Sequence, residues 1–292
     1  MNPQESFVSG YTRDPLRATG PTSAGDRATP PPFAIESTVM GIDGHPPMET
    51  LQGGAWLDHG FHVDSHTHVH GQLVYAASGL LATTTERGTW VAPANRVTWT
   101  PPRFEHSHRF YGSTDVRLVV IPTDLCGALV AHPGVFAVSP LLREALLALT
   151  DRGDQHPERK ERLRAVVIDE LVEAPDRSLH LPEPRDDRLR TVTDLLRADP
   201  GQSATLTALG RRAGASARTL SRLFNEELGM SFHRWRTVLR IHHALIHLTN
   251  GRSVTDTAIE CGWSNPTSFI DAFNDVVGQT PGRYQAALDA KG

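Results

Sequence analysis

The chain has 292 residues, of which 39% are hydrophobic and 21% charged, and its formal net charge at pH 7 is −4. This length suits about two domains that each bury a core, and the composition is ordinary for a soluble globular protein and excludes a fibrous one. No apolar run approaches the ~18–20 residues of a membrane span, no basic-then-apolar leader opens the chain, and two cysteines do not make a disulfide framework, so we expect a cytoplasmic protein without a membrane partner.

Short strands are expected after a tail without periodicity. Residues 1–32 are rich in Pro, Gly, Thr, Ser and Ala and carry no hydrophobic repeat, so we predict a disordered tail. From 33 to 125 the chain alternates short β-branched runs with Gly and Pro, which is typical of a sandwich or small barrel. A hairpin turn is expected at 86–88, and strands are expected at 72–76, 80–85, 89–91, 96–100 and 116–121.

The same region concentrates histidines, which stand at His59, His62, His66, His68, His70, His106 and His108. Side chains two residues apart on a strand share a face, so His66 and His68 project together, and Gln72 joins them if no bulge intervenes. The flanking His59, His62 and His70 are expected at the surface or at strand ends.

The spacing His66-x-His68-x3-Gln72, followed by a second motif that ends at His106, resembles the two motifs of cupin barrels. That resemblance implies a sensor barrel at 33–125 in which His66, His68 and His106 hold one divalent transition metal, namely zinc, nickel or iron. Cupins have a Glu where this chain has Gln72, so Gln72 is at best a weak fourth ligand, and Arg103 stands where the second motif usually has a Gly. The alternative is a barrel that keeps remnants of the motifs around an apolar pocket for an organic effector.

Two amphipathic helices are predicted after the strands, at 139–149 and 158–173. Their apolar faces suit packing on the barrel and packing on a partner subunit equally well. We therefore predict a helical dimerisation or packing segment at 126–174. Prolines and mixed charges at 175–186 predict a linker.

The part from 187 to 292 contains a helix-turn-helix pattern. Leu206, Leu209 and Ala213 recur at helical spacing and predict a short helix. Gly214 supplies the left-handed residue of a tight turn, and Ser216 is placed to cap the next helix. That second helix has a polar outer face, as has a helix that lies in the major groove of DNA.

The pattern occurs twice. The stretch 223–235 aligns with 272–284 at an offset of 49 residues, which indicates two copies of one unit. In the second copy Gly262 is the turn residue, and Ser264 or Asn265 caps the next helix. Between the copies, 231–249 predicts one helix of about 28 Å, which suits recognition helices in adjacent major-groove turns about 34 Å apart. A helical bundle with a duplicated hairpin is the alternative that needs no DNA.

Three stretches carry a family resemblance: Ser216-x3-Leu220-Ser221-Arg222-Leu223-Phe224, Arg240-x3-Ala244, and Gly262-Trp263-Ser264 with the later Gly278-x-Thr280-Pro281. Together they resemble the AraC/XylS family of bacterial transcription regulators. This resemblance implies a seven-helix DNA-binding domain with two helix-turn-helix units at 187–292. The DNA-contacting positions that it implies are Ser216, Arg218, Thr219, Ser221, Arg222 and Asn225, and then Asn265, Pro266, Thr267, Ile270 and Asp271. The chain departs from the family at Thr257, where an apolar residue is usual.

The net charge is divided unevenly along the chain. Residues 187–292 hold 13 Lys and Arg against 10 Asp and Glu, whereas residues 1–186 hold 16 against 23. The basic part coincides with the helix-turn-helix part, where phosphates would be met. An excess of three positive charges is small, so DNA binding is expected to depend also on dimerisation or on adjacent sites.

We therefore expect an α+β multidomain protein with an N-terminal cupin-like β-barrel and a C-terminal all-α double helix-turn-helix domain. Its expected function is sequence-specific regulation of transcription on double-stranded DNA by a homodimer, controlled by a metal or a small-molecule effector, with RNA polymerase as a partner if the protein activates. A cupin metalloenzyme with an appended helical domain is the alternative from another class, and Gln72 in place of a carboxylate disfavours it. An architectural DNA binder without an effector is the second alternative.

Overall fold

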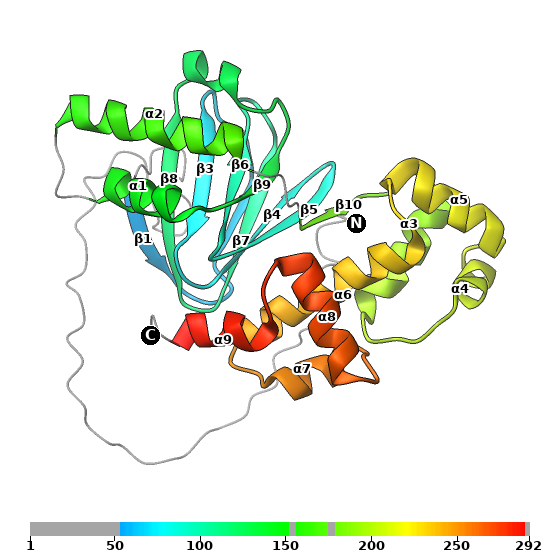
Figure 1. The fold of residues 1–292 in the computed structure, drawn as a ribbon. Helices are drawn as coiled ribbons and strands as arrows, with labels where there is room; N and C mark the ends of the chain where they lie inside the picture. The colour runs from blue at the N-terminus through cyan, green and yellow to red at the C-terminus, as the bar shows by residue number, and fades with distance from the viewer. Residues whose placement is uncertain (1–52, 152–155, 175–178, 290–292) are drawn as a thin grey trace. The chain divides into compact units, whose positions relative to one another are not determined.

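The computed structural model describes residues 53–151, 156–174 and 179–289, which belong to one unit of the chain (Figure 1). The predicted tail at 1–32 lies outside these residues, as do the first positions of the predicted barrel and part of the predicted linker. None of the helices in the described ranges combines the length and the apolar character that crossing a membrane requires.

The strands form two five-stranded antiparallel sheets, and each predicted strand is present. Sheet A has the order β1 (Gly53–Leu57), β8 (Thr114–Ile121), β3 (Gly71–Ala76), β6 (Arg96–Thr100) and β9 (Gly134–Ala137). Sheet B has the order β10 (His180–Pro182), β5 (Gly88–Pro93), β4 (Leu80–Thr85), β7 (His106–Tyr111) and β2 (His62–His66).

The predicted barrel is corrected to two sheets that face each other. A closed barrel needs strand pairing that continues around the ring, but among the described residues every pairing stays within one sheet. The edge strands β9 and β10 have four and three residues and pair on one side only. The sheets meet face to face, since the Gln72 side chain of β3 reaches His108 of β7 at 3.3 Å.

The outer face of sheet A is covered by two helices, α1 (Pro140–Thr150) and α2 (Pro157–Glu173), as Figure 1 shows. Alternate residues of β3, Leu73 and Tyr75, share one hydrophobic cluster with the buried faces of these helices. Ser139 begins α1 because its Oγ accepts a hydrogen bond from the backbone N–H of Leu142 at 3.0 Å. Both helices lie where the apolar periodicity predicts them.

The segment predicted as a linker contains a strand. Strand β10 pairs with β5, so that His180 lies opposite Trp90 and the two rings stack with centroids 4.0 Å apart. A run of three residues carries too little alternation to be recognised in a sequence. Its partner strand, 90 positions earlier, determines its conformation.

The C-terminal part consists of helices, as predicted. They are α3 (Asp187–Ala198), α4 (Leu206–Arg212), α5 (Ala217–Leu228), α6 (Phe232–Thr249), α7 (Val254–Glu260), α8 (Pro266–Val277) and α9 (Pro281–Asp289). The turns between α4 and α5 and between α7 and α8 contain Gly214 and Gly262, with φ of 64° and 80°. Only glycine adopts this left-handed region freely, so the two predicted helix-turn-helix units are confirmed together with their turn residues.

The buried faces of α6, α8 and α9 and residues of sheet B form one hydrophobic cluster. Leu80 of β4 and Tyr111 of β7 belong to it together with Leu245 of α6 and Phe273 of α8. The Nε2 of His242 in α6 lies 2.8 Å from the carbonyl oxygen of Leu179, next to β10. Sheet B therefore packs on the double helix-turn-helix, and sheet A reaches it through Arg96 of β6, which donates from Nη2 to the carbonyl oxygen of Val277 in α8 at 2.9 Å.

Candidate nucleic-acid interface and metal centre

The first helix-turn-helix unit presents a polar face on α5. Ser216 caps the helix, because its Oγ accepts a hydrogen bond from the backbone N–H of Thr219 at 3.1 Å. The inner face is anchored by Leu220, Leu223 and Phe224, all buried. The opposite face exposes four of the predicted contact residues, namely Arg218, Ser221, Arg222 and Asn225, while Thr219 is half-buried beside the cap.

One residue that the sequence reading did not single out modifies this face. Glu226 accepts a hydrogen bond from Arg222, with Nη1 and Oε2 2.9 Å apart, and both side chains are exposed. Arg218 forms no ion pair with any described residue. A DNA phosphate therefore has to compete with Glu226 for Arg222 but not for Arg218. The i, i+4 spacing of Arg222 and Glu226 is a signal that the sequence already contained.

The second unit presents a face of different chemistry on α8. Asn265 is the capping residue, because its Oδ1 accepts a hydrogen bond from the N–H of Thr267 at 2.8 Å, and Pro266 occupies the first turn. Thr267, Ile270 and Asp271 are exposed. This helix contains no Lys or Arg, so its face offers hydrogen bonds and apolar contacts but no positive side chain.

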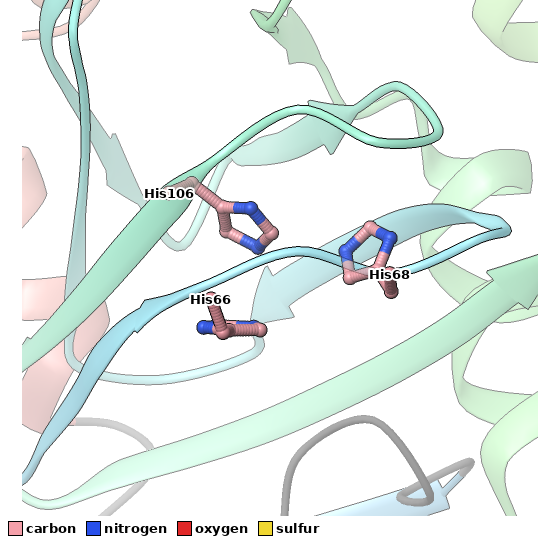
Figure 2. Close-up of side chains that lie close together, drawn as sticks. All are labelled: His66, His68 and His106. Carbon is pink, nitrogen blue, oxygen red and sulfur yellow. The ribbon is translucent and has the colours of Figure 1, made fainter.

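Three histidines from separate parts of the sheet domain converge (Figure 2). His66 ends β2, His68 follows in the next loop, and His106 begins β7. Strands β2 and β7 are paired with His66 opposite His106. One ring nitrogen of each histidine lies within 4.8 Å of the others, so the three predicted metal ligands are brought together by the register of one strand pair.

Hydrogen bonds orient the three rings in the same way. The Nδ1 atoms of His66 and His106 lie 2.8 Å from the carbonyl oxygens of residues 64 and 104, and Nδ1 of His68 bonds to the carbonyl oxygen of residue 70. A carbonyl accepts only, so each Nδ1 carries the proton and each Nε2 keeps a lone pair. All three Nε2 atoms are buried, and none has a hydrogen-bond partner of ordinary length among the described residues, although the side chain of Gln72 lies near enough to His68 to act on its pKa.

Burial favours the neutral form of two of these imidazoles, those of His106 and His68. It lowers the pKa of His106 to about 3, with further lowering by the neighbouring His66 and His68. Burial also lowers the pKa of His68. Neutral imidazoles with free Nε2 lone pairs are the form that binds a transition metal, so the residues present fit a divalent metal ion of the zinc, nickel or iron type.

Gln72 lies beside this cluster, but a fourth histidine engages it. Oε1 of Gln72 is 3.3 Å from Nε2 of His108, and Nδ1 of His108 is 3.0 Å from the hydroxyl oxygen of Thr83. His108 is buried, and its ring centroid is 4.9 Å from that of His106. The position of the His108 side chain could have been predicted from the sequence, because residues 106 and 108 are two apart on β7 and share a face. His108 therefore holds Gln72 beside the three ligand candidates.

The flanking histidines take no part in the cluster. His59, His62 and His70 are all exposed, as expected from the sequence. Nδ1 of His59 accepts a hydrogen bond from the backbone N–H of Gly112 at 3.1 Å. These side chains offer exposed controls for experiments on the buried histidines.

Comparisons with known proteins agree with the helical architecture. A family model described as a helix-turn-helix domain matches residues 209–287. The chain is 34% identical over 235 residues to the HTH-type transcriptional regulator NimR of Escherichia coli strain K12, which covers 76% of this chain and 82% of that protein. It is also 34% identical over 101 residues to an uncharacterized HTH-type transcriptional regulator of Staphylococcus aureus strain COL, of whose length it spans 14%. A crystal structure of the DNA-binding domain of AdpA with a target DNA is similar over 36% of this chain and 96% of that one, at 28% identity and a TM-score of 0.35.

Proposed function

Because the chain belongs to the AraC-type family of helix-turn-helix transcription regulators, we propose that it reads double-stranded DNA with α5 and α8 under the control of a transition-metal ion. The ion is held by His66, His68 and His106. The observation that carries the metal proposal is the convergence of three buried Nε2 atoms that have no partner among the described residues. Unpaired buried acceptors cost free energy, and a metal ion removes that cost.

The ligand residues supply position and charge state. Bound to three imidazoles, an ion of this type keeps open coordination positions for water or a small ligand. Through His66 and His68 the ion would be attached to the end of β2 and to the loop after it, and through His106 to the start of β7. We expect binding to fasten this edge of sheet B. Sheet B packs on α6, so a change in its order can reach the DNA-reading helices.

Metal content tests the site. The purified chain should contain about one divalent ion, most plausibly zinc, nickel or iron, as measured by elemental analysis. His66→Ala combined with His68→Ala should abolish it. The matched pair His62→Ala with His70→Ala removes exposed histidines from the same stretch and should leave the content unchanged. Stoichiometric metal in the first pair would sink the proposal.

DNA affinity tests the control. A duplex selected by the protein from a random library serves as the probe, and binding is followed by fluorescence anisotropy. Removing the metal with a chelator and restoring it should change the affinity about fivefold or more, and the His66→Ala/His68→Ala protein should not respond. If the affinity is the same with and without metal, control by the metal is wrong. The proposal that α5 and α8 read DNA is not affected by that result.

A second candidate for control is an organic effector, favoured by a cavity of about 400 Å³. Such a volume suits a small molecule. Tyr75, Asn95 and Arg143 supply polar groups to its wall, and Ala287 and Leu288 of α9 supply apolar ones. A small molecule that shifts the melting temperature of the wild-type chain and its DNA affinity, but not those of Ala287→Trp, would support this candidate.

The partners follow from the same proposal. We infer a homodimer, supported by Leu141 on α1 and Val172 on α2, which are 57% and 56% exposed although apolar. RNA polymerase is the further partner if the protein activates transcription. A regulator of this kind acts on DNA in the cytoplasm. Sedimentation velocity tests the dimer, and Leu141→Glu with Val172→Glu should shift it toward the monomer.

A further inference from the structure

The loop that leads into the first helix-turn-helix unit touches the turn of the second unit, so the two units are joined by more than α6. Gly201, in the loop between α3 and α4, faces Gly262, in the turn between α7 and α8. A Cβ atom on Gly262 would lie 2.2 Å from the carbonyl oxygen of Gly201, and one on Gly201 would lie 2.7 Å from the carbonyl oxygen of Glu260. Both distances are shorter than any side chain permits, so the two backbones are packed as closely as glycine alone allows.

A single arginine joins this contact to the middle of α6. Arg240 donates from Nε to the carbonyl oxygen of Pro200 at 2.9 Å, and from Nη2 to the carbonyl oxygens of residues 202 and 201 at 2.9 and 3.3 Å. The planar guanidinium fork suits several acceptors at once. The guanidinium carbon Cζ lies 5.5 Å from the ring centroid of Trp263, in the turn of the second unit. From the helix between the units, Arg240 thus contacts the loop that leads into the first unit and the turn of the second.

The geometry has a consequence for how the units are held. A helix that joins two units at its ends leaves each of them free to tilt about its own end. Here the loop that leads into the first unit and the turn of the second unit are fastened to each other and to α6. We call Arg240, Trp263, Gly201 and Gly262 the Arg240 clasp. The clasp closes a second connection, so α5 and α8 are held at one separation and one angle.

We propose that the Arg240 clasp sets the register of the two recognition helices on DNA, and that Arg240 is a positioning residue for the spacing of the two half-sites. The proposal rests on DNA reading by α5 and α8 and is independent of the metal site. One inserted base pair moves a half-site by about 3.4 Å and rotates it by about 35° about the duplex axis. A rigid pair of helices cannot follow that change, whereas a hinged pair can.

The test is an in vitro selection from random duplexes with the full chain, followed by affinity measurements. Wild-type protein should select two half-sites at one spacing and lose about tenfold or more in affinity when one base pair is inserted or deleted between them. Arg240→Gln should select the same half-site sequences at several spacings, and its loss for one base pair should fall to about threefold or less. Arg240→Lys keeps the charge but not the planar fork. Its loss of affinity for one inserted or deleted base pair should therefore lie between that of the wild type and that of Arg240→Gln.

A matched variant separates this role from a merely structural one. Arg236 lies one turn earlier on α6, donates to one carbonyl oxygen, that of Ala204, at 3.2 Å, and stacks on Phe232, so neither of these contacts involves the second unit. Arg236→Gln should therefore keep the wild-type spacing. A single spacing retained by both Arg240→Gln and Arg240→Lys would overturn the proposal, and if Arg240→Gln does not fold, Arg240→Lys decides alone. Wild-type protein that selects no sequence would overturn DNA reading itself.

Discussion

At the scale of single residues, the chemistry depends on whether buried polar atoms have partners. Three Nε2 atoms that converge without a partner among the described residues support the proposed metal site, whereas both ring nitrogens of His108 have partners. A buried hydroxyl without a partner is different, because no ligand is proposed to bind it and it only costs free energy. Thr257 provides that case, at the position where the family usually has an apolar residue.

Thr257→Val should stabilise the protein. The Thr257 side chain is fully buried in α7, and its hydroxyl has no hydrogen-bond partner among the described residues. Replacing the hydroxyl by a methyl group of similar size removes an unpaired polar group, so the free energy of unfolding should rise by about 1 kcal/mol. Urea denaturation measures it. The control is Thr83→Val, where the lost hydroxyl bonds to His108, and this variant should be destabilised by about 1–3 kcal/mol. Equal effects in the two variants would contradict the argument.

His242 should make the protein sensitive to acid. Burial lowers the pKa of His242 from 6.5 to about 3 in the folded protein. Below pH 6.5 the unfolded chain therefore binds a proton at this histidine that the folded protein does not bind. The free energy of unfolding is unaffected by His242 above that pH and falls as the pH drops toward 3. The loss due to this histidine should be about 2 kcal/mol at pH 5.

The measurement is the free energy of unfolding at pH 7 and at pH 5. His242→Gln keeps a donor for the carbonyl oxygen of Leu179 and should reduce the difference between the two values by the same 2 kcal/mol or so. His233→Gln, at an exposed position of the same helix, serves as the control and should leave the difference unchanged. An unaltered difference in His242→Gln would show that His242 is already protonated or exposed at pH 5.

At the scale of elements, the two recognition helices have the same kind of residues at their ends but outward faces of different charge. Both begin at a side-chain cap and end at a left-handed glycine, Gly229 after α5 and Gly278 after α8. The beginning and the end of each helix are determined locally, so they repeat wherever the capping residue and the glycine recur. The outward faces are free of that constraint, and they have diverged to two arginines on α5 and none on α8.

The first recognition helix should therefore carry most of the affinity and of the salt dependence. Counterion release scales with the cations brought to phosphate, by about −0.9 in the logarithmic slope for each. Arg218→Ala with Arg222→Ala should weaken binding by about tenfold or more and flatten the slope. Thr267→Ala with Asp271→Ala should change the slope little and even tighten binding, since Asp271 repels the polyanion. Both pairs are assayed on one selected duplex across a salt series. Greater damage from the second pair would mean that Asp271 accepts a hydrogen bond from a cytosine.

At the scale of the whole molecule, the sheet domain shares a hydrophobic core with α6 and with the second helix-turn-helix unit. Leu80 of β4 lies in one cluster with Leu245 of α6 and Phe273 of α8, whereas Leu73 of β3 lies in the other cluster, with α1 and α2. Sheet B is thus stabilised partly by α6 and α8 of the helical part. A perturbation in one of these parts should be felt in the other.

Leu80→Ala should loosen α6 as well as its own strand. A buried Leu→Ala change costs about 2–5 kcal/mol, and here the cavity opens against α6. Hydrogen exchange resolved by peptide should show faster exchange over both β4 and α6. Leu73→Ala makes a cavity of the same kind on the side of α1 and α2, where exchange should rise most. Unchanged protection of α6 in Leu80→Ala would mean that the two parts are not coupled through this cluster.

The local features of the chain were predictable from its sequence. Caps, turn glycines and apolar periodicity act within a few residues, so Ser216, Gly214 and Gly262 identified their helices and turns, and the repeat at 49 residues identified the two units. The alternation of the strands also placed β3, β4, β5, β6 and β8, but it did not decide which strands pair. The spacing of the strands left a sandwich or a small barrel open, and the resemblance to cupins favoured the barrel. The structure has two sheets without closure, because closure depends on the pairing of edges far apart in the chain.

The sequence by itself determined the helix-turn-helix pair, its polar recognition faces and the identity of three histidines that suit a metal. Only the tertiary structure decided that His66 meets His106, since 40 residues separate them and one strand register joins them. It also decided that β10 completes sheet B and that Arg240 holds three carbonyl oxygens of a distant loop. The physical reason is range: hydrogen bonds within a helix or turn are fixed by neighbours in the chain, whereas contacts between sheets, loops and units exist only after the whole core has formed.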